Sequence, residues 1–191
     1  MKIDVAKHLT LGAKRTLKAF RQAMFDTLSE KEFDKITVND ICEKSEYPRA
    51  TFYNYFDDKM DLLHYLWTHI SKEILQTVPP VESNEEGLIK TFNSLLSFFN
   101  DNRQLFTNIK QNNGVDSHLW RNMAGYLKEE ANQIVFINYS SQGNCKVPRK
   151  LLANFYSDII IVMLEWCLFE DPETTSKDAD QYLTALLHGG L

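Results

Sequence analysis

Residues 36–59 read ITVNDICEKSEYPRATFYNYFDDK, a stretch that predicts two short helices joined by a tight turn. Thr37 has the side chain of a helix N-cap, and Asp40, three residues later, completes a capping-box pattern. Pro48 suits the first position of the second helix, because its fixed φ is helical and its missing N–H is not needed there. The two aspartates that follow can cap a third, longer helix. Two short helices braced by longer neighbours are typical of a helix-turn-helix motif.

The second helix of this pair has two different faces at helical spacing. Its apolar face consists of Phe52, Tyr55 and Phe56. The side chains that are left pointing at least partly outward are Arg49, Thr51, Tyr53 and Asn54. A helix of this length fits a major groove, so the outward set is a candidate for contact with bases and phosphates.

This stretch resembles the TetR/AcrR family of bacterial transcriptional repressors. The resemblance is carried by residues 36–38, by Ile41 and above all by the run 49–59, which two leucines follow. It extends from about residue 9 to residue 67 and is only architectural beyond that. The resemblance implies a DNA-binding head and a helical domain that senses a ligand and dimerises.

Two positions depart from the family's pattern. Glu46 stands in the turn where the family usually has glycine, and Pro48 stands where it usually has serine or threonine. A non-glycine residue with a positive φ costs on the order of 1 kcal/mol. We therefore expect the turn at Glu46 to be either strained or differently shaped.

The composition of the whole chain predicts an all-α fold. Its 191 residues include only seven glycines and five prolines, and no segment alternates in the manner of a strand. We expect about nine helices, with an N-terminal three-helix head over residues 9–75, its helix-turn-helix at 37–56, and a C-terminal antiparallel helical bundle over 83–188. The expected boundary is the proline pair at 79–80 and the polar run after it.

Charge is unevenly distributed along the chain, whose net charge is −5. Residues 1–56 hold ten Lys and Arg against eight Asp and Glu, whereas the remainder is acidic. A mildly basic head suits a protein that touches phosphate at one end only. Within this head, Lys14, Lys18 and Arg21 share one face of the first helix, where they form either a solvated stripe or a phosphate contact.

No chemistry of catalysis is apparent in the sequence. It contains no HExxH, nucleophile elbow, phosphate-binding glycine loop or CxxC, so we expect neither an enzyme nor a cofactor or metal site. Asp61 and His64 have carboxylate–histidine spacing, but a di-iron bundle needs two such motifs. The three cysteines are expected to be reduced thiols in a cytoplasmic protein. The longest apolar run, 159–164, is too short for a membrane span, and no secretory signal is visible.

A second copy of the chain is the expected partner of the helix predicted over about residues 151–169. Residues 159–164 are apolar around the whole circumference of a helix, which must then be covered on all sides. A second subunit is the simplest cover, and burial inside a single bundle is the alternative. In the family, the last two helices of each subunit form a four-helix dimer interface. The expected interface residues are Ile160, Ile161, Leu164, Leu168, Leu183, Leu186 and Leu187.

The residues of the motif can be given different roles on DNA. The guanidinium of Arg49 can bind guanine or a phosphate, and Asn54 can read adenine or remain solvated. By resemblance, the phosphates would be bound by Thr37, Tyr53, Tyr55 and Lys59, although core packing is the favoured role of Tyr55. The full predicted set is Thr37, Pro48, Arg49, Ala50, Thr51, Tyr53, Asn54, Tyr55 and Lys59.

The aromatic residues of the bundle form either an ordinary core or, as the family suggests, a cavity for a small apolar effector. The candidates are Phe92, Phe99, Phe106, Trp120, Tyr126 and Phe155. We therefore expect a ligand-responsive repressor that binds a near-palindromic operator in double-stranded DNA as a homodimer, with no membrane partner. The alternative is a module of the same fold that has lost operator binding and uses its bundle to bind a protein partner. The outward side chains of Arg49, Thr51 and Tyr53 argue against this alternative.

Overall fold

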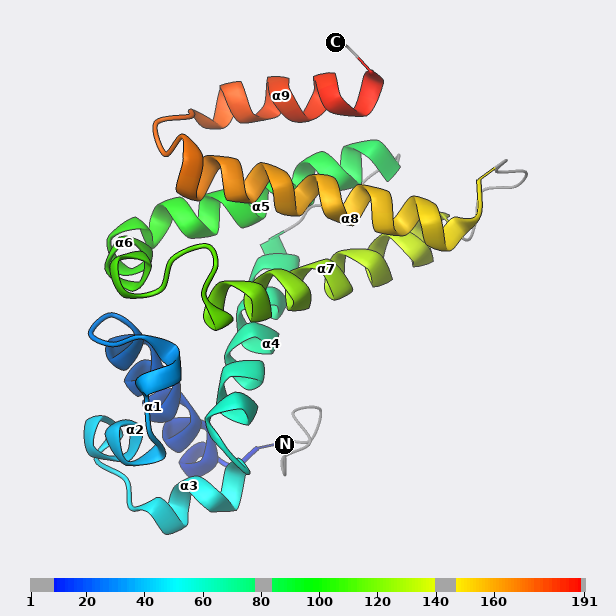
Figure 1. Ribbon diagram of the computed structural model, residues 1–191. Coiled ribbons are helices and arrows are strands. Elements are labelled where there is room, and N and C mark those ends of the chain that lie inside the picture. Colours follow the sequence, from blue (N-terminus) through cyan, green and yellow to red (C-terminus); the bar gives the residue numbers. More distant parts are fainter. Residues whose placement is uncertain (1–8, 78–83, 140–146, 190–191) are drawn as a thin grey trace. The chain divides into compact units, whose positions relative to one another are not determined.

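The computed structural model describes residues 9–77, 84–139 and 147–189, and every regular element in those ranges is helical (Figure 1). This confirms the all-α class, and nine α-helices lie in the described ranges, as expected. Two further short elements are the 3₁₀ turn η1 and the π-helical turn η2. The elements are α1 (Leu11–Leu28), η1 (Phe33–Lys35), α2 (Val38–Ser45), α3 (Arg49–Tyr55), α4 (Lys59–Thr77), α5 (Asn84–Asp101), α6 (Arg103–Asn112), α7 (His118–Tyr139), α8 (Arg149–Glu165), η2 (Trp166–Glu170) and α9 (Ser176–His188).

Side-chain caps explain where the helices of the motif begin. Thr37 and Asp40 form the predicted capping box, in which the N–H of Asp40 donates to Thr37 Oγ1 at 3.2 Å and the N–H of Thr37 donates to Asp40 Oδ2 at 2.8 Å. Asp58 Oδ1 accepts from the N–H of Asp61 at 2.9 Å and caps α4. The position expected for Pro48 is wrong by one residue. It is the N-cap of α3 rather than its first helical residue, because its ψ of 150° is extended.

The chain divides into two compact units. The first consists of residues 1–70 and 102–121, and the second of residues 71–101 and 122–191. This division differs from the predicted split into 9–75 and 83–188, because α6 packs with α1 and residues 112–118 contact the end of α1 and the segment after it. The predicted boundary at the proline pair lies outside the described residues.

The core of the first unit is centred on Phe20 of α1. Its ring meets that of Phe52 edge-on at 5.4 Å and 87°, and that of Phe56 at 6.1 Å and 83°. All three side chains are fully buried, and such edge-to-face pairs are a favourable aromatic geometry. The apolar face of α3 is thereby fixed against α1, which leaves its polar face outward.

In the second unit, α9 packs against α5 and α8 (Figure 1). His188 Nε2 at the end of α9 lies 2.7 Å from Glu85 Oε1 at the start of α5, so these two helices are antiparallel. The side chains that fill the core between the three helices are buried to 6% exposure or less; they include Phe92, Leu95, Leu96, Ile160, Leu164, Ala179 and Leu183.

Helix α8 buries one face only. Four apolar side chains at spacings of four, seven and four residues are exposed along α8 and η2. They are Leu151 (58%), Phe155 (52%), Val162 (57%) and Trp166 (45%). The alternative that the helix is buried on all sides inside one bundle is therefore wrong for this stripe.

The segment Arg149–Glu170 also has the length and composition of a membrane-crossing helix, with a mean hydropathy of 1.6. The sequence expectation that no such segment exists rested on the uninterrupted run 159–164 and was too narrow. Length and composition do not separate a membrane span from a helix of a soluble bundle, which meets the same criterion. A third of the apolar window is buried within the chain.

The capping box makes the head sensitive to acid. A hydrogen bond from Lys31 and those from Thr37 lower the pKa of Asp40 from 3.8 to about 2. A carboxylate with a lowered pKa stabilises the folded state above its unfolded pKa and loses that contribution as the pH falls toward the folded pKa. The contribution of Asp40 should therefore disappear between about pH 4 and pH 2.

Wild type should lose about 1 kcal/mol of its free energy of unfolding as Asp40 is protonated, and we predict that Asp40→Asn does not show this loss. The value is modest because solvent partly screens the pair of Asp40 with Lys31. The measurement is the free energy of unfolding in urea at several pH values across that window. The same substitution at the exposed Asp116 serves as control. If the free energy of unfolding falls by the same amount in wild type and in Asp40→Asn across this pH window, the assignment is contradicted.

Candidate nucleic-acid interface

The structure leaves most of the predicted DNA-binding set open to solvent. The exposed members are Thr37, Pro48, Arg49, Ala50, Tyr53 and Asn54. Thr51 is half-buried. Tyr55 is also half-buried, and its ring lies 6.5 Å from that of Phe20, so part of this side chain belongs to the core, as its spacing favoured. DNA contact by the exposed set remains a prediction.

Arg49 is held against the side chain one turn further along α3. Its Nη2 donates to the phenol oxygen of Tyr53 at 3.3 Å, and its guanidinium carbon lies 5.9 Å from the ring centroid. The Tyr53 ring stands edge-on to the buried Phe52 at 5.5 Å and 88°. The core therefore orients the ring and the ring orients the guanidinium, which lowers the conformational entropy that Arg49 has to lose on binding.

The turn between α2 and α3 adopts the strained one of the two expected geometries. Glu46 has φ 59° and ψ 25°, and it is the one non-glycine residue with positive φ in the described ranges. The left-handed residue closes α2 as a C-cap, with the N–H of Tyr47 donating to the carbonyl of Cys42 at 3.2 Å. The glutamate thus reproduces the turn that glycine would form without strain.

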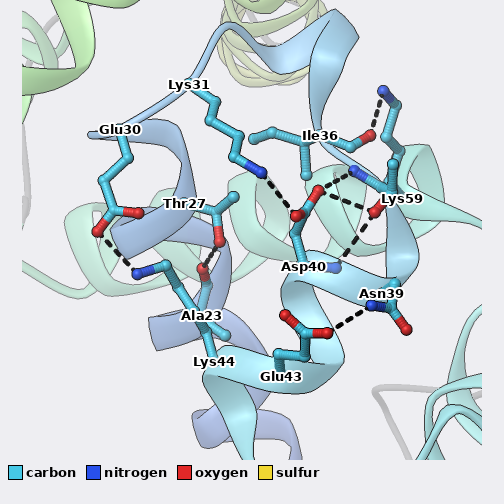
Figure 2. Close-up of polar contacts among 11 residues, drawn as sticks. Ala23, Thr27, Glu30, Lys31, Ile36, Asn39, Asp40, Glu43, Lys44 and Lys59 are labelled. Carbon is cyan, nitrogen blue, oxygen red and sulfur yellow. Dashed lines mark hydrogen bonds and ion pairs between the residues drawn. The ribbon is translucent and has the colours of Figure 1, made fainter.

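Two ion pairs fasten the segment after α1 to α2, and Figure 2 shows both. Lys31 Nζ lies 2.6 Å from Asp40 Oδ1, and Lys44 Nζ lies 2.7 Å from Glu30 Oε1. These two lysines of the basic head are therefore engaged within the protein. By contrast, Lys14 and Lys18 of α1 are exposed and make no ion pair with any described residue.

Lys59 has a structural role that sequence reasoning missed. Its ammonium donates to three backbone carbonyls, those of Phe33 (2.8 Å), Asp34 (3.0 Å) and Ile36 (2.8 Å), and lies 4.7 Å from the centroid of the Phe33 ring (Figure 2 shows the bond to Ile36). An ammonium has three N–H donors, and here all three are used inside the first unit. The expectation that Lys59 binds a phosphate is therefore corrected: the lysine closes the segment around η1 and has no donor left.

The predicted ligand-binding aromatics are divided between the two units. Phe106 and Trp120 belong to the first unit and the other four to the second. Phe92 and Phe99 are buried, whereas Phe155 is 52% exposed on the outer stripe of α8 and does not line an internal cavity. A pocket of about 480 Å³ in the second unit lies between the end of α4 and α5, and none of the six residues lines it.

The predicted interface residues fall into two groups. Ile160, Leu164 and Leu183 are at most 1% exposed, so they are core residues of their own protomer and have no surface to offer a partner. The members that reach the surface at least in part are Ile161, Leu168, Leu186 and Leu187. The sequence did not predict that the exposed stripe on α8 and η2 would face outward together with Tyr182 and Leu186 of α9. The reason is that the sequence alone does not indicate which face of an all-apolar helix is packed.

The carboxylate of Asp61 has a local structural role rather than a place in a metal site. Asp61, which has carboxylate–histidine spacing with His64, accepts from the N–H of Asp57 at 3.0 Å. The described ranges hold no group of three or more His, Cys, Asp or Glu suited to a metal ion.

Asn113, which the sequence did not single out, is 3% exposed and hydrogen-bonds to the end of α1 and the segment after it. No local pattern points to that contact, because its partners lie about 80 residues away.

The role of Lys59 can be tested by removing its charge. We predict that Lys59→Met lowers the free energy of unfolding by about 1–3 kcal/mol, because three carbonyls lose a charged donor while the aliphatic stem is kept. Lys35→Met is the matched control, since Lys35 is 71% exposed and pairs only with Glu32; its effect should stay within about 0.5 kcal/mol. Urea unfolding measures both, and equal small effects would contradict the assignment.

Solved structures with this fold cover nearly the whole chain. A TetR-family transcriptional regulator from Syntrophomonas wolfei str. Goettingen has a TM-score of 0.67 at 20% identity, over 91% of this chain and 93% of its own. A TetR transcriptional regulator from Streptococcus agalactiae 2603V has a TM-score of 0.62 at 20% identity, over 91% and 93%. The fatty acid degradation regulator FadR from Bacillus halodurans has a TM-score of 0.63 at 15% identity, over 97% and 98%. At these identities the similarity shows the fold alone.

Sequence comparison adds to the fold. The uncharacterized HTH-type transcriptional regulator YxbF of Bacillus subtilis (strain 168) is 27% identical over 185 residues, which are 93% of this chain. The chain spans about half, 47%, of that relative's length. Residues 22–66 match the family model of the bacterial regulatory proteins, tetR family, and this range runs from the middle of α1 into α4 and contains the whole helix-turn-helix. Over these residues the chain is similar to the bacterial regulatory proteins of the tetR family.

Proposed function

We propose that this chain is a sequence-specific DNA-binding transcriptional regulator that acts in the cytoplasm as a homodimeric, ligand-responsive repressor. The observation that carries the proposal is the exposed polar face of α3, where Arg49, Tyr53 and Asn54 stand outward while Phe52 is fully buried. A short helix with this division of faces can enter a major groove about 12 Å wide without unfolding its own core. The operator would then be a near-palindrome, because two-fold symmetry places two such helices in successive grooves.

Phosphate binding in this proposal moves away from Lys59 and toward α1. Lys14 and Lys18 are one turn apart on one face of α1, both are exposed, and neither has an ion-pair partner in the described part of the chain. Thr37 is exposed at the N-terminus of α2, but its N–H and its hydroxyl both donate to Asp40 Oδ2 at 2.8 Å, so we place the phosphate contact on α1. Of the two roles open to the α1 stripe, phosphate contact is the one we adopt.

The homodimer would form through the outer face of α8, η2 and α9. Leu151, Phe155, Val162 and Trp166 make one continuous stripe, and Tyr182 and Leu186 stand one turn apart on α9. An exposed apolar patch of this kind is uncommon on a monomer and is typical of an interface. A two-fold axis across it would present two reading helices at once.

An effector bound by the bundle would act by a rigid-body change in the spacing of the two reading helices. The aromatic content of the bundle supports an apolar effector. Repression, rather than activation, follows from the family resemblance of the head.

The competing function is a module with this fold that binds a protein partner and no longer binds DNA. A gel shift with the chromosomal region upstream of the chain's own coding sequence, followed by selection from random duplexes, separates the two. A discrete shifted species at nanomolar to micromolar protein supports the regulator. The regulator is refuted if neither the upstream region nor any selected duplex is retained at low salt.

Arg49 is the residue expected to carry sequence preference. We predict that Arg49→Ala relaxes preference at one base pair per half-site by ~1–3 kcal/mol, because a bidentate guanidinium–guanine contact is lost. Tyr53→Phe should instead weaken binding evenly across sequences. Arg15→Ala removes the same charge from α1 and controls for electrostatics alone.

The measurement is binding-site selection with each variant. If Arg49→Ala selects the wild-type consensus at lower affinity, as Arg15→Ala is expected to do, then Arg49 binds a phosphate and does not read a base.

The dimer face is tested with Val162→Asp and Leu186→Asp. Both side chains are exposed in the protomer, so the fold should survive, while a buried charge in the interface should raise the dimer dissociation constant by at least ~30-fold, equivalent to about 2 kcal/mol. Leu11→Asp, at a 74% exposed leucine of α1, is the control. Sedimentation velocity across a concentration series gives the constant. A wild-type protein that stays monomeric at high micromolar concentration would remove the basis for this interface.

A further inference from the structure

We propose that the C-terminal end of α6 is an integral part of the DNA-binding unit and that Asn113 is a positioning residue for DNA binding. In this inference, which rests on the proposed DNA-binding function, the Asn113 amide holds the segment between α1 and α2 in the conformation that the reading helix needs. The helix-turn-helix alone, residues 37–56, would then be insufficient as a reading head.

Asn113 joins two parts of the chain that are far apart in sequence. Its Oδ1 accepts from the N–H of Phe33 at 2.8 Å, and its Nδ2 lies 3.2 Å from the carbonyl oxygens of both Leu28 and Lys31. The carbonyl of Ile109 in α6 also lies 3.2 Å from Nδ2, so three carbonyls share its two N–H groups. The residue is only 3% exposed, so water cannot replace these partners.

The neighbouring Asn112 strengthens the same contact. Its Nδ2 donates to the carbonyl of Ser29 at 3.0 Å. The carbonyls at 28 and 29 belong to the end of α1, where the helix no longer supplies donors for its own carbonyls. The end of α6 therefore caps the end of α1 through side-chain amides.

The segment that Asn113 holds is the one that fixes α2. Within it, Lys31 pairs with Asp40 and Glu30 pairs with Lys44, both on α2 (Figure 2). At its far end the Lys59 ammonium binds the carbonyls of Phe33 and Ile36. A displacement of residues 28–33 would therefore be passed directly to α2, against which α3 packs.

An amide is the side chain that this position requires. It offers an acceptor to the Phe33 N–H and donors to the carbonyls at once, which neither a carboxylate nor an apolar side chain of similar size can do. Asn113→Ala would leave a buried N–H and two buried carbonyls without their partners. Asn112→Ala removes the half-buried bond to Ser29, together with a longer bond back to Asn108 in α6, and gives a milder version of the same change.

The test combines hydrogen exchange with DNA binding and uses the variants Asn113→Ala and Asn112→Ala. The control is Gln111→Ala, because this residue is exposed and makes no hydrogen bond or ion pair with a described residue. Circular dichroism and sedimentation first establish a temperature at which each variant is folded and assembled as the wild type. There we expect the Phe33 amide to exchange at least ~10-fold faster in Asn113→Ala, and affinity for a selected duplex to fall ~10-fold or more. Asn112→Ala should move affinity in the same direction by less, and Gln111→Ala should match the wild type.

The outcomes separate this inference from the proposed function. Faster exchange at Phe33 with unchanged affinity overturns the positioning role and leaves DNA binding intact. If Asn113→Ala does not fold, the decision rests on Asn112→Ala, and wild-type affinity in that variant overturns the inference. A wild-type protein that selects no duplex refutes the proposed function itself, and with it any role of Asn113 on DNA.

Discussion

The first unit depends on how the backbone between α1 and α2 satisfies its polar groups. Residues 29–37 contain no regular ladder except the single turn of η1, so their carbonyls and N–H groups need partners from elsewhere. Two side chains from elsewhere in the chain supply five of these partners: Asn113 from the end of α6 and Lys59 from the start of α4. A charged ammonium is the stronger donor of the two, and its hydrogen bonds contribute more than neutral ones. The orientation of α2, and through it that of α3, follows from this arrangement.

The elements that sequence could predict are those set by local chemistry. The capping box of Thr37 and Asp40 depends on neighbours within a few positions, so the pattern in the sequence already contains it. For Glu46 the sequence indicated an unusual turn but did not decide between a strained and a differently shaped one. The roles of Lys59 and Asn113 could not be predicted, because their partners lie 23 to 85 residues away. For Lys59 the family resemblance pointed toward phosphate, whereas the geometry uses all of its donors internally. A lysine that lies next to a helix-turn-helix in the sequence is therefore not by itself evidence of a contact with DNA.

Helix α8 illustrates a different limit of sequence reasoning. A helix that is apolar around its circumference must be covered, but its hydrophobicity does not distinguish the face packed in the protomer from the face left open. The structure resolves this by burying Ile160 and Leu164 and exposing Phe155 and Val162. The cover by a second subunit stays a prediction, and three of its expected residues, Ile160, Leu164 and Leu183, lie on the packed side. Burial, not composition, decides which residues can meet a partner.

The charge of the head also looks different once its internal pairs are known. Lys31, Lys44 and Lys59 are each bound to a carboxylate or to carbonyls within the first unit, so a count of basic residues overstates the charge available to DNA. Among the described residues before α4, the exposed cations without such partners lie on α1, with Arg49 at the start of α3. In a protein of net charge −5, these cations add little long-range attraction for DNA. Its affinity would have to come from the fit of a rigidly held α3 in the groove, which is why the polar contacts that fix the head matter more than its charge.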